Sequence, residues 1–164
     1  MAALPSSAPL DPGEPGGPGA REGTPLSRAG GAGCPDLRCP GVPADGAAVR
    51  ALRERISRWA LAAGLRPDQV LDVEIAVYEA MANVVVHAYP ATATGTFDVE
   101  AHACLEAVTI TVTDRGQWQP VPRPVPLHGR GIPLIRKLAD EACIDAGAAG
   151  TTVTMSWAMP RARR

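Results

Sequence analysis

Two polar side chains in an otherwise apolar segment, EIAVYEAMANVVVHAYP at residues 74–90, could support chemistry on a bound ligand. Glu79 and Asn83 are four residues apart, so in a helix they lie one turn apart on the same face. The amide oxygen of Asn83 could bind Mg²⁺, a hard cation that takes oxygen ligands and often shares them with phosphates. Glu79 could accept a proton from an attacking hydroxyl or water. Taken alone, such a pair is more often an exposed polar stripe on an amphipathic helix.

A second pattern, TDRGQW at residues 113–118, follows an apolar run rich in β-branched residues. Asp114 could accept a hydrogen bond from an exocyclic amine such as N6 of adenine. Gly116, which has no side chain, would let the backbone approach the ring closely. The alternative is an ordinary Asp-x-Gly turn, which is a common way for a strand to end.

Two further short motifs contain glycine. In HGRGI, Gly129 and Gly131 precede a helical pattern, so free N–H groups and the positive end of the helix dipole would face an anion. No Gly-Lys-Ser/Thr follows, so this is not a Walker phosphate loop, and a flexible hinge is the alternative. In GTTVT, which contains Thr151, the pattern alone indicates a turn into a strand.

The elements that position these motifs are predicted by hydrophobic periodicity. Apolar residues spaced three and four apart predict a helix over residues 46–63, and a second helix over residues 68–88 that ends before Pro90. Alternating apolar residues predict a hairpin with its turn near Glu106, and a second hairpin over residues 142–159. A short helix at residues 132–141 lies between the hairpins. In the second helix, four apolar residues form the side opposite the polar pair: Val73, Val77, Ala80 and Val84.

This order of elements predicts an α/β two-layer sandwich, with helices on one face of a mixed, mainly antiparallel sheet. Residues 1–44 hold nine of the 17 prolines and nine of the 17 glycines. Such a segment buries too little apolar area to offset its ordering entropy, so a disordered tail is predicted there. The stretch DLRCPGV near its end could still add an edge strand. The folded domain is predicted to span residues 45–160.

Composition and charge argue against several classes of function. A net charge of −1 provides no basic footprint for nucleic acid, and no apolar run approaches the ~18–20 residues that span a bilayer. The N-terminus lacks the basic start and apolar core of a secretory signal, so a cytoplasmic protein is expected. The four cysteines have no C-x-x-C spacing and the three histidines are scattered, so no zinc site is expected.

In order and spacing, the four motifs together resemble the ATP-binding domain of the GHKL superfamily, which includes gyrases, histidine kinases and MutL proteins. A helical E-x-x-x-N, a D-x-G after a strand, a G-x-G before a helix and a G-T on the last strand all occur between residues 45 and 160. Within the superfamily, AVYEAMANVVVHAY, TDRGQW and HGRGIPLIRKLAD are most similar to the bacterial anti-sigma-factor serine/threonine kinases.

The resemblance implies the Bergerat fold, an α/β sandwich that binds ATP and Mg²⁺ beneath a lid, here residues 117–128. It implies that Glu79 is the catalytic base, Asn83 the magnesium ligand and Asp114 the aspartate that recognises adenine. The remaining implied nucleotide contacts are Gly116 beside the base, Gly129 and Gly131 at the phosphates, and Thr151 near adenine.

The resemblance also implies a protein serine/threonine kinase that holds a sigma factor and phosphorylates an antagonist protein; homodimers are common in that family. Ala82 departs from it, since many members have threonine there, and His128 and Pro133 stand where other branches have glycine. These departures leave open a non-catalytic nucleotide-binding module that sequesters a partner protein. A histidine kinase is not expected, because a 44-residue tail is too short for the helical hairpin that carries the phospho-acceptor histidine.

Overall fold

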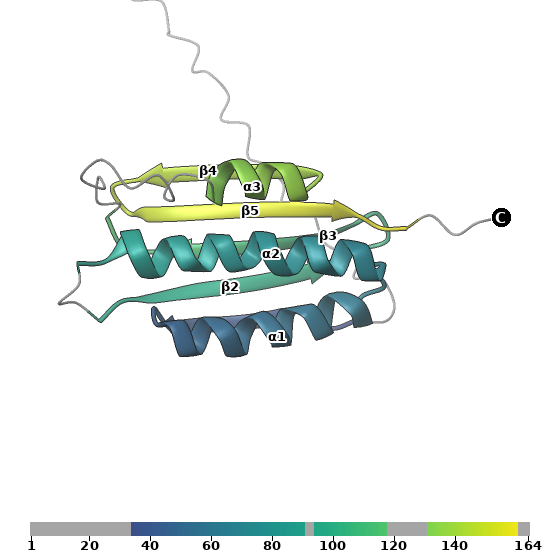
Figure 1. The fold of residues 1–164 in the computed structure, drawn as a ribbon, viewed down its shortest axis with the longest axis horizontal. Coiled ribbons are helices and arrows are strands. Elements are labelled where there is room, and N and C mark those ends of the chain that lie inside the picture. Colours follow the sequence, from purple (N-terminus) through teal and green to yellow (C-terminus); the bar gives the residue numbers. More distant parts are fainter. Residues whose placement is uncertain (1–33, 91–93, 118–130, 161–164) are drawn as a thin grey trace, which may run out of the picture.

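The structure is a computed structural model that describes residues 34–90, 94–117 and 131–160. Its elements follow one another as β1 (Leu37–Pro43), α1 (Gly46–Ala62), α2 (Pro67–Asn83), a π-helical turn η1 (Val84–Ala88), β2 (Thr96–Ala103), β3 (Ala107–Asp114), α3 (Gly131–Leu138), β4 (Glu141–Gly147) and β5 (Gly150–Ala158). The strands form one sheet in the order β1-β2-β3-β5-β4. Figure 1 shows α2 between α1 and α3 over one face of that sheet.

The predicted two-layer α/β sandwich is confirmed by this arrangement. All four strand pairs of the described sheet are antiparallel, so this part of the chain has no parallel pair where a mixed sheet was expected. The core lies between the helices and the sheet, and Trp157 and Phe97 are its largest fully buried side chains.

A capping residue precedes α1, and a glycine follows it. Asp45 Oδ1 accepts hydrogen bonds from the N–H groups of Ala47 (2.9 Å) and Ala48 (2.8 Å), two donors without a partner inside the helix. Gly64 follows the helix with a φ of 104°, which favours glycine. The buried side of α1 has the predicted period and includes Val49, Leu52, Ile56 and Trp59.

α2 has the predicted apolar side but a different end. The four residues opposite Glu79 and Asn83 are buried, with exposures of 0–4%: Val73, Val77, Ala80 and Val84. The α-helix ends at Asn83, and residues Val84–Ala88 form the π-helical turn η1 where α-helix was predicted to residue 88. A π turn closes its hydrogen bonds over one more residue than an α turn, which changes the direction of the side chains after Asn83. Neither α2 nor another helix in the described ranges is long and apolar enough to cross a membrane.

Both predicted hairpins are present. On β2 and β3, buried side chains alternate with outward ones, and Phe97 and Val99 of β2 face the helices with Ile110 and Val112 of β3. The turn between these strands contains Glu106, as predicted. β4 and β5 form the second hairpin.

The sheet includes residues that the sequence analysis assigned to the tail. Residues 37–43 form the edge strand β1, so the predicted domain boundary at residue 45 is too late. Leu37 and Cys39 are each 7% exposed, and Trp59 Nε1 donates a hydrogen bond to the carbonyl of Pro35 at 2.8 Å. Two inward apolar residues are too short a pattern to identify a strand, which is why DLRCPGV remained only an alternative. Residues 1–33 lie outside the described residues.

We expect two N-terminal truncations to differ in stability. Removing residues 1–33, whose composition predicts little burial, should leave the melting temperature of the domain nearly unchanged. Removing residues 1–43 should lower it by more than about 5 °C, on the order of 1 kcal/mol or more, because Leu37 and Cys39 leave the core and β2 becomes an open edge. Thermal unfolding followed by circular dichroism measures both. An unchanged melting temperature after removal of residues 1–43 would contradict this account.

Candidate functional site

The polar pair on α2 faces the first residue of α3. A Cβ atom placed on Gly131 would lie 3.1 Å from Glu79 Oε2, and 3.2 and 3.3 Å from Asn83 Nδ2 and Oδ1. These separations are tighter than ordinary contacts, so the absence of a side chain at Gly131 lets α3 begin this close to α2. The structure therefore brings together three of the predicted site residues from two separate helices.

The N-terminal end of α3 adds hydrogen-bond donors beside this pair. The first N–H groups of a helix have no partner within it, and the helix dipole gives that end a partial positive charge. Pro133 lies in the first turn, where its missing N–H removes no helical hydrogen bond. His128, Gly129 and all of the expected lid beyond Gln117 lie outside the described residues. The assignment of Gly129 therefore stays a prediction.

Asp114, the last residue of β3, is a buried carboxylate. It is 3% exposed, and its Oδ1 accepts a hydrogen bond from the N–H of Gly116 at 2.9 Å. Thr151 lies beside the same carboxylate. Among residues 34–90, 94–117 and 131–160, Asp114 and Thr151 are the only buried polar or charged side chains. Both are predicted site residues.

Burial raises the pKa of Asp114 above its ordinary value, and the hydrogen bonds from Gly116 and Thr151 oppose that rise only in part. An ionised carboxylate has about four acceptor positions. Gly116 donates one hydrogen bond to Asp114 Oδ1. The carboxylate therefore keeps acceptor capacity that a donor on a bound ligand can use.

The raised pKa of Asp114 predicts a pH dependence of stability. The folded protein binds the Asp114 proton more tightly than the unfolded chain does. The resulting stabilisation is complete below the unfolded pKa of about 3.9 and is lost as the pH rises through the higher folded value. The melting temperature of the parent minus that of Asp114→Asn should therefore fall as the pH rises from about 4 towards 7. Scanning calorimetry across that range checks the sign, and a difference that grows with pH would show a lowered pKa instead.

Two glycines allow the Asp114 turn to pack against neighbouring backbone. A Cβ atom on Gly116 would overlap the carbonyl of Ala88, and one on Gly150 would overlap the carbonyl of Asp114. Gly150 also has a φ of 125°, which other residues rarely adopt. The turn is therefore held between the end of η1 and the start of β5. Thr151 is among the predicted site residues, whereas Gly150, which precedes it in the same G-T pattern, had no predicted role.

The π-helical turn η1 connects the two groups of site residues. It begins directly after Asn83, and its last residue, Ala88, contacts Gly116. π turns inside helices occur frequently at functional sites. The only signal for this one in the sequence is the run of three valines at residues 84–86, since successive β-branched side chains crowd an α-helix. Glu79, Asn83 and Gly131 thus lie at one end of η1, and Asp114, Gly116 and Thr151 lie at the other.

The donor set suits a cation that is shared with a ligand. The described parts of the chain contain no group of three or more Asp, Glu, His or Cys side chains able to hold a metal ion by themselves. Asn83 offers an amide oxygen beside the N-terminal end of α3, one helical turn from the Glu79 carboxylate. Mg²⁺ takes few protein ligands, keeps several waters and binds phosphate oxygens as well, so this set fits it.

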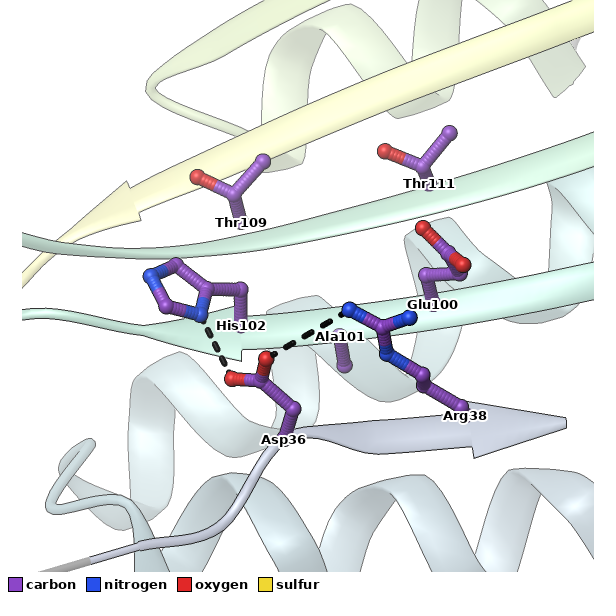
Figure 2. Close-up of a pocket in the computed structure, with 7 residues that line it drawn as sticks. All are labelled: Asp36, Arg38, Glu100, Ala101, His102, Thr109 and Thr111. Carbon is purple, nitrogen blue, oxygen red and sulfur yellow. Dashed lines mark hydrogen bonds and ion pairs between the residues drawn. The ribbon is translucent and has the colours of Figure 1, made fainter. Parts of the chain in front are cut away.

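A polar hollow lies on the opposite face of the sheet from the helices (Figure 2). Asp36 links two of its side chains, because its oxygens lie 2.5 Å from His102 Nδ1 and 4.0 Å from Arg38 Nη2. The hollow is lined by Asp36, Arg38, Glu100, Ala101, His102, Thr109 and Thr111. None of the predicted site residues lines it, so this hollow is separate from the candidate site.

Comparison with known proteins gives three findings. The histidine kinase-like ATPase domain family matches residues 42–157. The anti-sigma F factor of Clostridium botulinum is 37% identical over 65 residues, which are 38% of this chain and 46% of that protein. A crystal structure of the RsbU and RsbW domains of Rv1364c from Mycobacterium tuberculosis matches with a TM-score of 0.60 and 29% identity, covering 77% of this chain and 33% of that one. The chain thus spans less than half the length of either protein.

Proposed function

Because the chain belongs to the histidine kinase-like ATPase family, we propose that the site between α2, α3 and the Asp114 turn binds ATP together with Mg²⁺. The observation that carries this proposal is the buried carboxylate of Asp114, which accepts a hydrogen bond from Gly116, lies beside Thr151 and keeps acceptor capacity for a ligand. The exocyclic amine of adenine is a donor that fits this acceptor. A hydrogen bond to a charged group contributes ~1.5–3 kcal/mol.

The two groups of site residues suit the two ends of ATP. At the base end, Asp114 accepts from the adenine amine and Gly116 leaves room for the ring. At the phosphate end, the amide oxygen of Asn83 holds Mg²⁺, and N–H groups at the start of α3, from Gly131 onwards, bind phosphate oxygens. Gly129 is assigned to the phosphates as well. Mg²⁺, when bound, neutralises phosphate charge and so assists phosphoryl transfer.

We assign Glu79 to the reaction itself. Its Oε2 lies beside Gly131 and one helical turn from Asn83, at the phosphate end of the site. From that position the carboxylate can orient an attacking hydroxyl and accept its proton. Phosphoryl transfer depends on alignment and charge neutralisation more than on covalent participation by the protein. A single general base beside bound Mg-ATP is therefore sufficient for phosphoryl transfer.

We further propose that the protein is an anti-sigma serine/threonine kinase that holds a sigma factor and phosphorylates an antagonist protein. The similarity to an anti-sigma F factor and to a structure containing an RsbW domain supports this assignment. Action on a sigma factor places the protein in the cytoplasm, and homodimerisation is expected from the family. Direct contact with nucleic acid or membrane is not part of the proposal.

Sequestration of a partner protein without phosphorylation is the second candidate function. Ala82 favours it, because this residue directly precedes Asn83 on α2 and many members of the anti-sigma kinase family have threonine there. An alanine has no hydroxyl to contribute beside the metal ligand. In this case ATP would still bind, and the protein would control its partner by occupancy alone.

Transfer of labelled phosphate separates these two functions. The full chain, Mg²⁺ and γ-labelled ATP are incubated with purified small antagonist proteins from the source organism. The kinase proposal expects label on a serine or threonine of one antagonist, and loss of that label when EDTA is added first. Tight ATP binding without label on any antagonist would overturn the kinase and favour sequestration. Absence of ATP binding would overturn both functions.

A further inference from the structure

Arg115, the middle residue of the Asp114–Gly116 turn, is held from two sides. Its backbone N–H donates a hydrogen bond to the hydroxyl oxygen of Tyr89 at 3.3 Å. Its side chain is mostly exposed, yet Nη2 lies 2.6 Å from Asp98 Oδ2 in an ion pair. Both contacts come from segments outside the turn, one after η1 and one on β2.

Tyr89 is itself fixed in place. Its hydroxyl donates to the carbonyl of Thr96 at 2.5 Å, so its oxygen lone pairs remain free to accept from Arg115. The ring lies directly against Gly95, where an added Cβ atom would overlap it. The hydroxyl therefore links the first residue of β2 to the Asp114 turn through a ring that has little room to move.

Asp98 connects the same turn to the edge strand. Its Oδ1 accepts a hydrogen bond from the N–H of Gly41 at 2.7 Å, and its Oδ2 pairs with Arg115. Gly41 lies at the irregularity of β1 between Cys39 and Val42 and has a φ of 63°. The Gly41 hydrogen bond and the Arg115 side chain both lower the pKa of Asp98, so the carboxylate is ionised at neutral pH.

We propose that Tyr89 and Asp98 are positioning residues that set the selectivity for adenine by holding Arg115, and with it Asp114 and Gly116, in place. This inference rests on the proposed function, in which Asp114 accepts a hydrogen bond from the exocyclic amine of adenine. A hydrogen bond weakens steeply when its distance and angle change. If the turn moves, the hydrogen bond between Asp114 and the exocyclic amine is therefore the first contact to be lost. The phosphate end, formed by α2 and α3, contains neither residue and is unaffected.

Inosine triphosphate isolates this effect, because it differs from ATP by a carbonyl in place of the exocyclic amine. The measured quantity is the ratio of the dissociation constant of inosine triphosphate to that of ATP, obtained by calorimetry on the full chain with Mg²⁺. Three variants loosen the turn: Tyr89→Phe, Asp98→Asn and Arg115→Ala. Each should lower the ratio roughly two- to tenfold, the effect of one hydrogen bond. Asp98→Asn and Arg115→Ala each remove one partner of the same ion pair, so these two variants should give similar ratios.

Two control substitutions match these changes away from the turn. Tyr78→Phe removes a hydroxyl from a tyrosine on α2 whose ring lies under Arg53, and Asp36→Asn neutralises a carboxylate that pairs with His102. Both should keep the parental ratio. A residue with only a structural role would lower the melting temperature, or weaken both nucleotides equally, without changing the ratio. An unchanged ratio in all three turn variants would therefore overturn the role of Tyr89 and Asp98 in selectivity but not the proposed function. A parent that binds neither nucleotide would overturn the proposed function as well.

Discussion

Glu79→Gln should nearly stop phosphoryl transfer while leaving the affinity for Mg-ATP close to that of the parent protein. Glutamine keeps the size of the side chain and its fit on α2, but its amide cannot accept a proton at neutral pH. General-base catalysis typically contributes ~10²–10⁴-fold in rate. The ground-state contacts of the proposed site come from Asp114, Asn83 and the start of α3, and this substitution removes none of them.

Single-turnover transfer and ATP affinity, measured on the same preparations, check this result. Glu74→Gln is the matched control, because Glu74 is on the same helix but pairs with Arg53 of α1 at 2.7 Å. It should transfer phosphate at nearly the parental rate. Asn83→Ala should instead weaken nucleotide binding itself, since it removes the proposed metal ligand. A parental transfer rate in Glu79→Gln would show that Glu79 is not the base.

Asp114→Ala should weaken ATP binding by roughly tenfold or more. The substitution removes the acceptor of the adenine amine, and a hydrogen bond to a charged group is worth ~1.5–3 kcal/mol. It also leaves the buried N–H of Gly116 without its partner. The unliganded variant should therefore be less stable, and its affinity has to be measured well below its melting temperature.

Calorimetric titration with Mg-ATP tests the Asp114 substitution. Asp145→Ala removes an exposed aspartate on β4 and serves as the control. The control should bind ATP as the parent does, because Asp145 points away from the core and is not part of the proposed site. Unchanged ATP affinity in folded Asp114→Ala would exclude Asp114 from the nucleotide pocket.

Much of the fold followed from periodic patterns in the sequence. The buried side of α2 was predictable because Val73, Val77, Ala80 and Val84 recur at helical spacing, and that side determined which way Glu79 and Asn83 face. The two hairpins were predictable for the same reason, since β-branched and apolar residues alternate along β2, β3 and β5. Contact between Glu79, Asn83 and Gly131 was expected only through the resemblance, because no periodicity links α2 to α3.

Features that leave no distinctive repeating pattern in the local sequence were not predictable. The π turn after Asn83 is one, because local spacing gives the same apolar side for either helix type. β1 is another, because its burial depends on pairing with β2, and two helices separate these strands in the sequence. The bonds that join Gly41, Asp98, Arg115 and Tyr89 use single polar residues without a repeating pattern. Sequence reasoning therefore proposed candidate ligand contacts and missed the residues that hold them in place.

A two-dimensional ¹H–¹⁵N NMR titration of the full chain with Mg-ADP shows whether the nucleotide binds between α2, α3 and the Asp114 turn. We expect large shift changes at the backbone amides of Gly116, Gly131 and Thr151 and at the side-chain amide of Asn83. The amides of His102 and Thr109, at the polar hollow on the opposite face of the sheet, should not move. Changes concentrated at the hollow, or none at saturating nucleotide, would show that Mg-ADP does not bind at the proposed site.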